Sequence, residues 1–206
     1  MPPTNGFFKL NDRKVDELAG TQIPREWWSR GYEYAFAIDN ALMGHAAADM
    51  GCGWMPRPLT PWLAKFYDKV YAVDADNRLL EQDKAANVVH VIADMTEEIR
   101  YIKANSVNDL YCISVLEDLQ KPDKIAAALK EFRRILKPGG CAIITFDVQY
   151  DINKPCPVYP GIADASKFLE LAAAAGLSPV TEVSYDKRGA VVNDEWNLCV
   201  FHCVLT

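Results

Sequence analysis

The stretch AAADMGCG, residues 46–53, places a short apolar run directly before a Gly-x-Gly turn. Glycine has no Cβ and tolerates positive φ, so a turn at Gly51 and Gly53 lets the backbone come close to a ligand. Turns of this kind after a buried strand are typical of sheets that bind nucleotide-like cofactors. The stretch therefore predicts a strand over 46–50 and a cofactor turn over 51–53.

On either side of this stretch, short apolar runs alternate with longer helical patterns. Four further runs have the character of strands: 69–73 before Asp74, 88–92 before Ala93-Asp94, 107–114, and 141–146. Apolar residues recur with a helical period over 124–136 and 164–175, and Gly176 stands where a helix C-terminal cap belongs. This alternation predicts a parallel sheet with helices on both faces.

The last two apolar runs, 178–185 and 196–205, lie on either side of a turn-like segment at 186–189. The segment between them is too short for a crossover helix. We therefore expect the two runs to pair as an antiparallel hairpin.

The first 45 residues are rich in aromatic side chains and lack the alternation of a strand. We interpret residues 1–45 as a helical lid segment of one or two helices over the carboxyl edge of the sheet, and residues 46–206 as a single folded unit. In this interpretation Tyr32, with Glu33 and Tyr34, closes over the ligand. Ordinary packing of an N-terminal helix is an equal alternative.

Length and composition narrow the class of protein. The chain has 206 residues, 50% of them hydrophobic, which suits one domain with a sizeable core. Its net charge of −6 argues against DNA or large RNA as a partner. The six cysteines form no CxxC pair, and no apolar run approaches the length of a membrane span. We expect a cytoplasmic protein with no membrane partner, and the oligomeric state stays open.

Acidic residues stand at the ends of three successive predicted strands. Asp49 stands just before the glycine turn, Asp74 comes about twenty residues after it, and Asp94 ends the next strand. A carboxylate at Asp74 can accept hydrogen bonds from two ribose hydroxyls, and Asp94 can accept one from the exocyclic amine of adenine. Each of these acidic residues taken alone could have a purely structural role, such as helix capping. Their order at successive strand ends favours a cofactor with an adenosine moiety.

These residues resemble the class I S-adenosylmethionine-dependent methyltransferases, in particular their small-molecule branch, over about residues 46–206. The resemblance implies a Rossmann-like, doubly wound α/β sheet of seven strands in the order 3-2-1-4-5-7-6, with strand 7 antiparallel. It also implies S-adenosylmethionine as the cofactor. The cofactor contacts that we expect are Tyr32, Asp49, Gly51, Cys52, Gly53, Asp74, Ala75, Asp94, Met95, Ser114 and Val115.

Two departures from the family pattern bear on the site. The third glycine of the first motif is replaced within residues 54–56, so the next helix is expected to start late, after Pro58 or Pro61. Asp118 stands where many small-molecule members have a histidine. The three histidines of the chain are interpreted as structural.

Methyl transfer from a sulfonium depends mainly on alignment, and a base is optional. If the acceptor is a hydroxyl or an acidic carbon, Asp118, Asp147 and Tyr150 are candidates to take its proton, because they follow the fourth and fifth strands. The short loop 148–161 and the absence of an inserted substrate domain favour a small-molecule acceptor.

Two other functions stay open. A nicotinamide-dependent dehydrogenase shares the glycine turn and the acid after the second strand, although Asp49 and the terminal hairpin favour the methyl donor. A non-catalytic, methyltransferase-like regulatory or scaffold protein is compatible with the missing third glycine and with Asp118.

Overall fold

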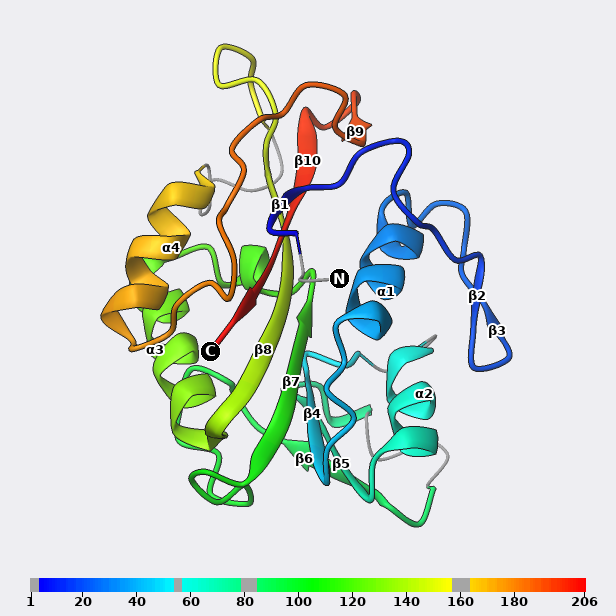
Figure 1. The fold of residues 1–206 in the computed structure, drawn as a ribbon, viewed down its shortest axis with the longest axis vertical. Coiled ribbons are helices and arrows are strands. Elements are labelled where there is room, and N and C mark those ends of the chain that lie inside the picture. The colour runs from blue at the N-terminus through cyan, green and yellow to red at the C-terminus, as the bar shows by residue number, and fades with distance from the viewer. Residues whose placement is uncertain (1–3, 54–56, 79–84, 157–163) are drawn as a thin grey trace.

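The computed structural model describes residues 4–53, 57–78, 85–156 and 164–206, and its centre is one large sheet (Figure 1). The strands lie in the order β1-β10-β8-β7-β4-β5-β6, with β9 paired to β10. Their bounds are β1 Gly6–Phe7, β4 Ala46–Met50, β5 Lys69–Asp74, β6 Val88–Ile92, β7 Val107–Ile113, β8 Leu136–Gln149, β9 Val192–Asn193 and β10 Leu198–Leu205. A separate two-stranded ribbon pairs β2 (Glu17–Leu18) with β3 (Thr21–Gln22).

Helices cover both faces of the sheet. In Figure 1, α1 (Arg30–Asp39) and α2 (Leu59–Phe66) lie on one side, and α3 (Pro122–Ile135) and α4 (Ala165–Ala174) lie on the other. A short 3₁₀ helix, η2 (Leu116–Leu119), follows β7. Among the described residues, no helix is both long enough and apolar enough to cross a membrane.

The predicted fold class is confirmed. β4 pairs in parallel with β5 and β7, β5 with β6, and β7 with β8, while β10 runs antiparallel to β8. This arrangement matches the expected order 3-2-1-4-5-7. The Rossmann-like arrangement brings the carboxyl ends of β4, β5, β7 and β8 to one edge, where the glycine turn lies.

The outer edge of the sheet differs in one detail from the expected hairpin. Residues 178–180 make the expected backbone hydrogen bonds to 204–206, but β1 then pairs with β10 in place of the rest of the 178–185 run. Asn5 explains this insertion, because its side chain bonds Thr181 on one side and the backbone N–H of Val204 on the other. The N-terminal segment thus supplies an edge strand as well as one helix.

The helices begin and end for local reasons that the sequence carries. Pro122 occupies the first turn of α3, where its missing N–H costs nothing. The Asp164 carboxylate accepts a hydrogen bond from the N–H of Ser166 at the start of α4, and Gly176, at φ +80°, follows its end. α2 starts at Leu59, directly after Pro58, as predicted.

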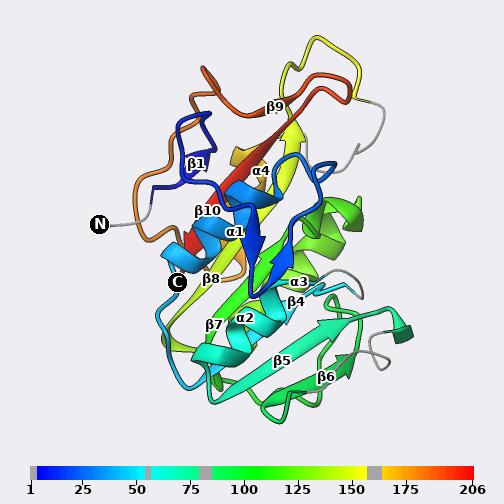
Figure 2. The ribbon, with the colours of Figure 1, turned by 90° about the vertical axis from the view of Figure 1, so that its right-hand side faces the viewer.

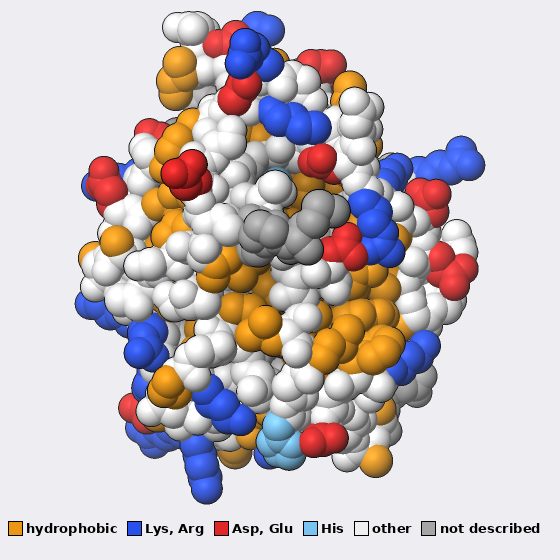
Figure 3. Space-filling model, in the orientation of Figure 1, with side chains coloured by type: hydrophobic (Ala, Val, Ile, Leu, Met, Phe, Trp, Pro, Cys, Tyr) orange, Lys and Arg blue, Asp and Glu red, His pale blue; other side chains and the backbone are white. Residues whose placement is uncertain are grey.

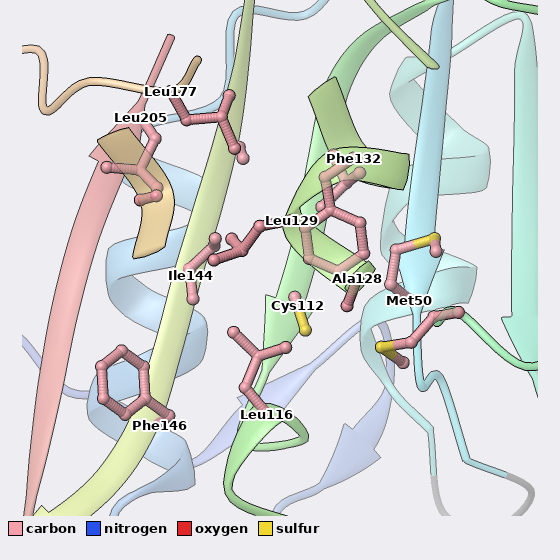
Figure 4. Packing of buried hydrophobic residues seen from close by; sticks show 14 of the residues in the cluster. Met50, Cys112, Leu116, Ala128, Leu129, Phe132, Ile144, Phe146, Leu177 and Leu205 are labelled. Atoms are coloured by element: carbon pink, nitrogen blue, oxygen red, sulfur yellow. The ribbon is translucent and has the colours of Figure 1, made fainter. Parts of the chain in front are cut away.

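The main core lies between the sheet and the helices α3 and α4 (Figure 4). Leu129 and Phe132 of α3 are fully buried and point toward Cys112 of β7 and Ile144 of β8. A second cluster packs α1 and α2 against the opposite face. Burial on both faces keeps the central strands rigid, which fixes the loops at their carboxyl ends.

Candidate functional site

The glycine turn after β4 is closed on one side and open on the other. Gly51 has φ +72°, and a Cβ placed on it would lie 2.5 Å from Cγ1 of Val115. Gly53 has φ +70°, and a Cβ there would meet no described residue within 4 Å. The backbone of Gly51 is therefore packed against the loop after β7, while the backbone of Gly53 faces open space.

The Asp74 carboxylate lies against this turn. Its Oδ2 accepts a hydrogen bond of 2.8 Å from the N–H of Gly53, and its Oδ1 accepts one of 2.9 Å from the N–H of Asp76. The structure thus brings together the turn and the acid that the sequence pairs by spacing. Ala75, next to Asp74, is exposed at the same edge.

Asp49 has a different environment. Its side chain is buried within β4, and its Oδ2 accepts a hydrogen bond of 2.6 Å from Oγ1 of Thr60 on α2. Burial raises the pKa of Asp49 to about 6, and the bond from Thr60 opposes that shift. Burial likewise raises the pKa of the neighbouring Cys52 thiol well above its usual range.

The strand end after β6 joins the same edge. The N–H of Ala93 bonds the carbonyl oxygen of Asp74 at 3.0 Å, which holds Asp94 beside the end of β5. Asp94 is exposed, and its Oδ1 accepts a hydrogen bond from the N–H of Thr96, which lowers its pKa. Met95 is buried and belongs to the main core rather than to the open edge.

A cavity of about 220 Å³ lies beside the turn, at the carboxyl ends of β7 and β8. Its lining comes from four places: the loop into α1, the segment after β7, the end of β8 and the loop before β10. The lining residues are Glu26, Trp27, Trp28, Ser29, Arg30, Ser114, Glu117, Asp118, Asp147 and Trp196. Ser114 faces this cavity while the next residue, Val115, packs on Gly51, so the cavity and the turn share one short segment.

Two buried carboxyl groups of the cavity have an oxygen without a partner. Glu117 is 2% exposed and Asp147 is 8% exposed, and Oε2 of Glu117 and Oδ1 of Asp147 make no hydrogen bond with any residue that the structure describes. Burial, and then the charge of Asp147, raise the pKa of Glu117 well above its usual value. Burial, and then Glu33, raise the pKa of Asp147. Burial also raises the pKa of Asp118.

Glu33 anchors α1 to the sheet beneath this cavity. Its side chain is fully buried, and its Oε2 accepts hydrogen bonds from Oγ of Ser114 at 2.6 Å and from Oγ1 of Thr145 at 2.5 Å. Its Oε1 accepts one from Oγ of Ser29 at 2.7 Å, and Arg30 reaches both oxygens at 3.1 Å. The acid that the sequence placed in a lid over the ligand instead joins α1 to the ends of β7 and β8.

The structure brings some of the expected site residues together and leaves others apart. Ser114, Asp118 and Asp147 line the cavity, and Gly51, Gly53 and Asp74 form the turn beside it. Tyr32 is not among the lining residues and packs against Phe8, with a ring separation of 6.1 Å. Tyr150 also lies outside the lining and packs against the main core. The expectation about the missing third glycine falls on residues 54–56, and most of the expected rim loop falls on 157–163; both stretches lie outside the described residues.

Sequence reasoning gave no role to Arg30 or Trp196, two of the cavity residues, and through the family resemblance it named Glu117 only as the end of the segment 114–117 that lines the cleft. Glu117 was recognisable from its place one turn after the fourth strand. Trp196 could not be predicted as a cavity residue, because its local sequence does not indicate that the loop before β10 lies beside the end of β7.

Comparisons with known proteins agree with this geometry. A sequence model of the methyltransferase-domain family matches residues 48–144. No curated protein matches the sequence. Among solved structures, the 4+2 cyclase SpnF superimposes with a TM-score of 0.69 at 15% identity, covering 98% of this chain and 86% of SpnF.

Two further solved structures are methyltransferases by description. Geranyl diphosphate C-methyltransferase from Streptomyces coelicolor A3(2) gives a TM-score of 0.62 at 12% identity, covering 98% of this chain and 90% of its own. The N-methyltransferase NodS from Bradyrhizobium japonicum WM9 gives 0.61 at 14% identity, covering 88% and 94%. At such identities these likenesses show the fold, and the different reactions in the three descriptions show that the fold does not fix the acceptor.

The cofactor that the family indicates is S-adenosylmethionine, and the residues at the turn fit such a group. The open side of Gly53 leaves room for a ligand along the backbone, and Asp74 is an acceptor at the place where a ribose would lie. The matching family model, the sheet order and this turn lead to one conclusion: residues 48–144 match the methyltransferase-domain family, and the sheet around them has the fold of the S-adenosylmethionine-dependent methyltransferases.

Proposed function

We propose that the protein transfers a methyl group from S-adenosylmethionine to a small-molecule acceptor held in the 220 Å³ cavity. The observation that carries this proposal is the junction at Ser114 and Val115, where the cavity meets the glycine turn. An acceptor in the cavity and a cofactor along the turn would lie on either side of that junction. The size of the cavity favours a small acceptor.

On the cofactor side, the roles follow from the contacts. Asp74 would accept hydrogen bonds from the ribose hydroxyls, and the backbone of residues 51–53 would lie along the cofactor with no side chain in the way. Asp94, held beside Asp74, would lie near the adenine edge. Asp49 and Cys52 would support the turn from below, since Asp49 is already bonded to Thr60.

On the acceptor side, the chain supplies alignment and a place for a proton. The sulfonium of the cofactor supplies an activated methyl group, so positioning of the acceptor is the main task of the protein. Glu33 fixes Ser114 and the start of α1, and residues 26–30 form the outer wall of the cavity. Asp147 and Asp118 line the cavity with raised pKa values, which suits groups that take up a proton.

Asp74→Ala tests the cofactor side. We expect it to weaken binding of S-adenosylhomocysteine by about 1.5–3 kcal/mol, because it removes charge-assisted hydrogen bonds. The measurement is calorimetric titration with S-adenosylhomocysteine, S-adenosylmethionine and NAD. Asp68→Ala is the matched control, since Asp68 is exposed just before the other end of β5 and pairs with His45. Unchanged affinity in Asp74→Ala, or tighter binding of NAD, would contradict the proposal.

A binding test does not separate an enzyme from a methyltransferase-like scaffold or from another reaction on the same fold. Formation of S-adenosylhomocysteine from S-adenosylmethionine, measured with a defined panel of small amines, phenols and carboxylic acids, makes that separation. Tight cofactor binding without turnover on any acceptor class would favour the scaffold.

A further inference from the structure

We propose that the methyl acceptor is an amine, which enters the cavity as an ammonium ion and binds between the carboxyl groups and the indole rings of its lining. The transfer step rests on the function proposed above, whereas binding of a cation in the cavity does not. Three observations support the proposal: the charge of the lining, the unpartnered oxygens, and the aromatic walls.

The lining has an excess of acidic groups. Four of its side chains carry a carboxyl group: Glu26, Glu117, Asp118 and Asp147. Arg30 is the one cation among the described lining residues, and both of its short contacts to a carboxylate go to Glu33, which lies outside the lining. The cavity therefore favours a positively charged ligand.

The unpartnered oxygens indicate that a ligand with hydrogen-bond donors binds in the cavity. Oε2 of Glu117 and Oδ1 of Asp147 are buried without a partner, and buried acceptors in native proteins are normally satisfied. An ammonium group carries several N–H donors and no acceptor, so it has a donor to offer to each of the two oxygens. A methyl acceptor with a hydroxyl group offers only one O–H donor. A methyl acceptor with a carboxylate group would add a negative charge to a cavity that is already acidic.

The remaining walls suit an organic cation. Trp27, Trp28 and Trp196 line the cavity, and the faces of indole rings attract cations more strongly than those of other side chains. The guanidinium of Arg30 already lies 5.8 Å from the ring centre of Trp27. An apolar cavity of about 150 Å³ holds benzene, so this cavity of about 220 Å³ has room for a small amine with its carbon substituents.

The transfer balances with the residues present. The Asp147 carboxylate accepts a proton from the bound ammonium, which leaves a neutral amine with a free lone pair. That lone pair forms the new N–C bond as the S–C bond breaks, and the bonding pair stays on sulfur. The products are the methylated ammonium ion and S-adenosylhomocysteine, and Asp147 then releases its proton to solvent.

The charged surroundings of the carboxyl pair predict a pH dependence. The titratable groups around Asp147 are Arg30 and Glu33 of α1, Glu26 before it, Glu117 and Asp118 of η2, and Cys199 of β10. Burial and the neighbouring acids raise the pKa values of Glu117 and Asp147, so both take up protons at higher pH than ordinary carboxyl groups. Affinity for a cation should therefore rise with pH through their titration.

The test uses tetramethylammonium, which cannot lose a proton or accept a methyl group. Because it has no N–H donor, it tests the charge and the aromatic walls, and methylammonium, which has N–H donors, is titrated beside it to test the hydrogen bonds to the two oxygens. We expect tetramethylammonium to bind the complex with S-adenosylhomocysteine at pH 8 about tenfold or more tighter than its neutral analogue tert-butanol, and pivalate to bind no better than tert-butanol. Calorimetry in two buffers of different ionisation enthalpy should show proton release on binding, which can come only from the protein. Affinity should fall as the pH is lowered.

Two variants connect the binding to the proposed residues. Asp147→Asn and Glu117→Gln keep the shape of the side chains and remove a negative charge near the cation, so each should reduce tetramethylammonium affinity by about tenfold and remove part of the proton release. Asp151→Asn is the control, because Asp151 lies just beyond the same strand and bonds the backbone N–H of Asn153 outside the cavity. Circular dichroism and S-adenosylhomocysteine affinity report whether each variant is folded.

The outcomes separate the two proposals. If S-adenosylhomocysteine binds but tert-butanol or pivalate binds as well as tetramethylammonium, the amine proposal is wrong and the proposed function stands. If S-adenosylhomocysteine does not bind, the proposed function itself is wrong. With S-adenosylmethionine, primary and secondary amines of the panel should be methylated in preference to phenols and carboxylic acids; the reverse preference would also overturn the amine proposal.

Discussion

Gly51 and Gly53 share a left-handed backbone, yet only Gly51 is sterically confined, by Val115. Gly51→Ala should therefore lose S-adenosylhomocysteine binding and also destabilise the fold by about 1–3 kcal/mol, because it adds a clash to the backbone strain. Gly53→Ala should lose binding at a smaller cost in stability, since its Cβ would occupy only the open side.

Gly189→Ala is the control that separates the effect of backbone strain from the effect of blocking the cofactor. Gly189 has φ +68° and nothing within 4 Å of an added Cβ, so the variant carries the same strain far from the turn. It should match Gly53→Ala in urea unfolding while binding S-adenosylhomocysteine normally. If Gly53→Ala binds as well as Gly189→Ala, the open side of the turn is not where the cofactor lies.

At the scale of elements, α1 is held to the sheet through Glu33. Glu33→Gln removes the charge that four donor side chains share, so we expect a loss of about 2–3 kcal/mol in the free energy of unfolding, measured with urea. It should also weaken binding of tetramethylammonium, because Ser114 and Arg30 lose their fixed positions at the cavity.

Glu131→Gln is the matched control for this anchor. Glu131 on α3 is buried, pairs with Arg134 three residues later and accepts a hydrogen bond from the N–H of Ile99, away from the cavity. It should destabilise the fold to a similar degree without changing ligand affinity. Equal effects of the two variants on ligand binding would mean that Glu33 acts through overall stability alone.

For the whole molecule, the acids of the cavity predict how stability depends on pH. Glu117 and Asp147 have pKa values raised above those of the unfolded chain, and Asp49 has one of about 6. Their contribution to stability is present below pH of about 4 and is lost as the pH rises through the raised values. The free energy of unfolding should therefore fall between pH 5 and pH 8.

Glu117→Gln should flatten this pH profile. At pH 8 the variant should be more stable than the wild type by roughly 1–3 kcal/mol, and at pH 5 the difference should shrink, as thermal and urea unfolding would show. The gain would come at the expense of cation binding. A variant less stable than the wild type at pH 8 would indicate that Glu117 makes a favourable contact when ionised.

The mainly parallel core of the sheet was predictable because its strands are specified by local apolar runs and its turn by two glycines. Asp74 was also predictable, since its spacing from the turn is set by one helix and one strand. The outer edge was not, because β1 has only two residues and pairs with β10 at the far end of the sequence. The cavity walls were only partly predictable, because the burial of Glu117 and the position of Trp196 depend on how distant segments fold together.

The pairing of β1 with β10 also sets the order in which the molecule can be completed. Gly6 lies opposite His202, and the residues around it also bond Ser184 and Val191, so among the described residues the partners of β1 all come from the last part of the sequence. During synthesis the parallel core can form from its nearer neighbours, while the N-terminal segment, with the outer wall of the cavity that it carries, waits for β10 to leave the ribosome. Cofactor-binding loops would thus assemble before the acceptor cavity has its outer wall.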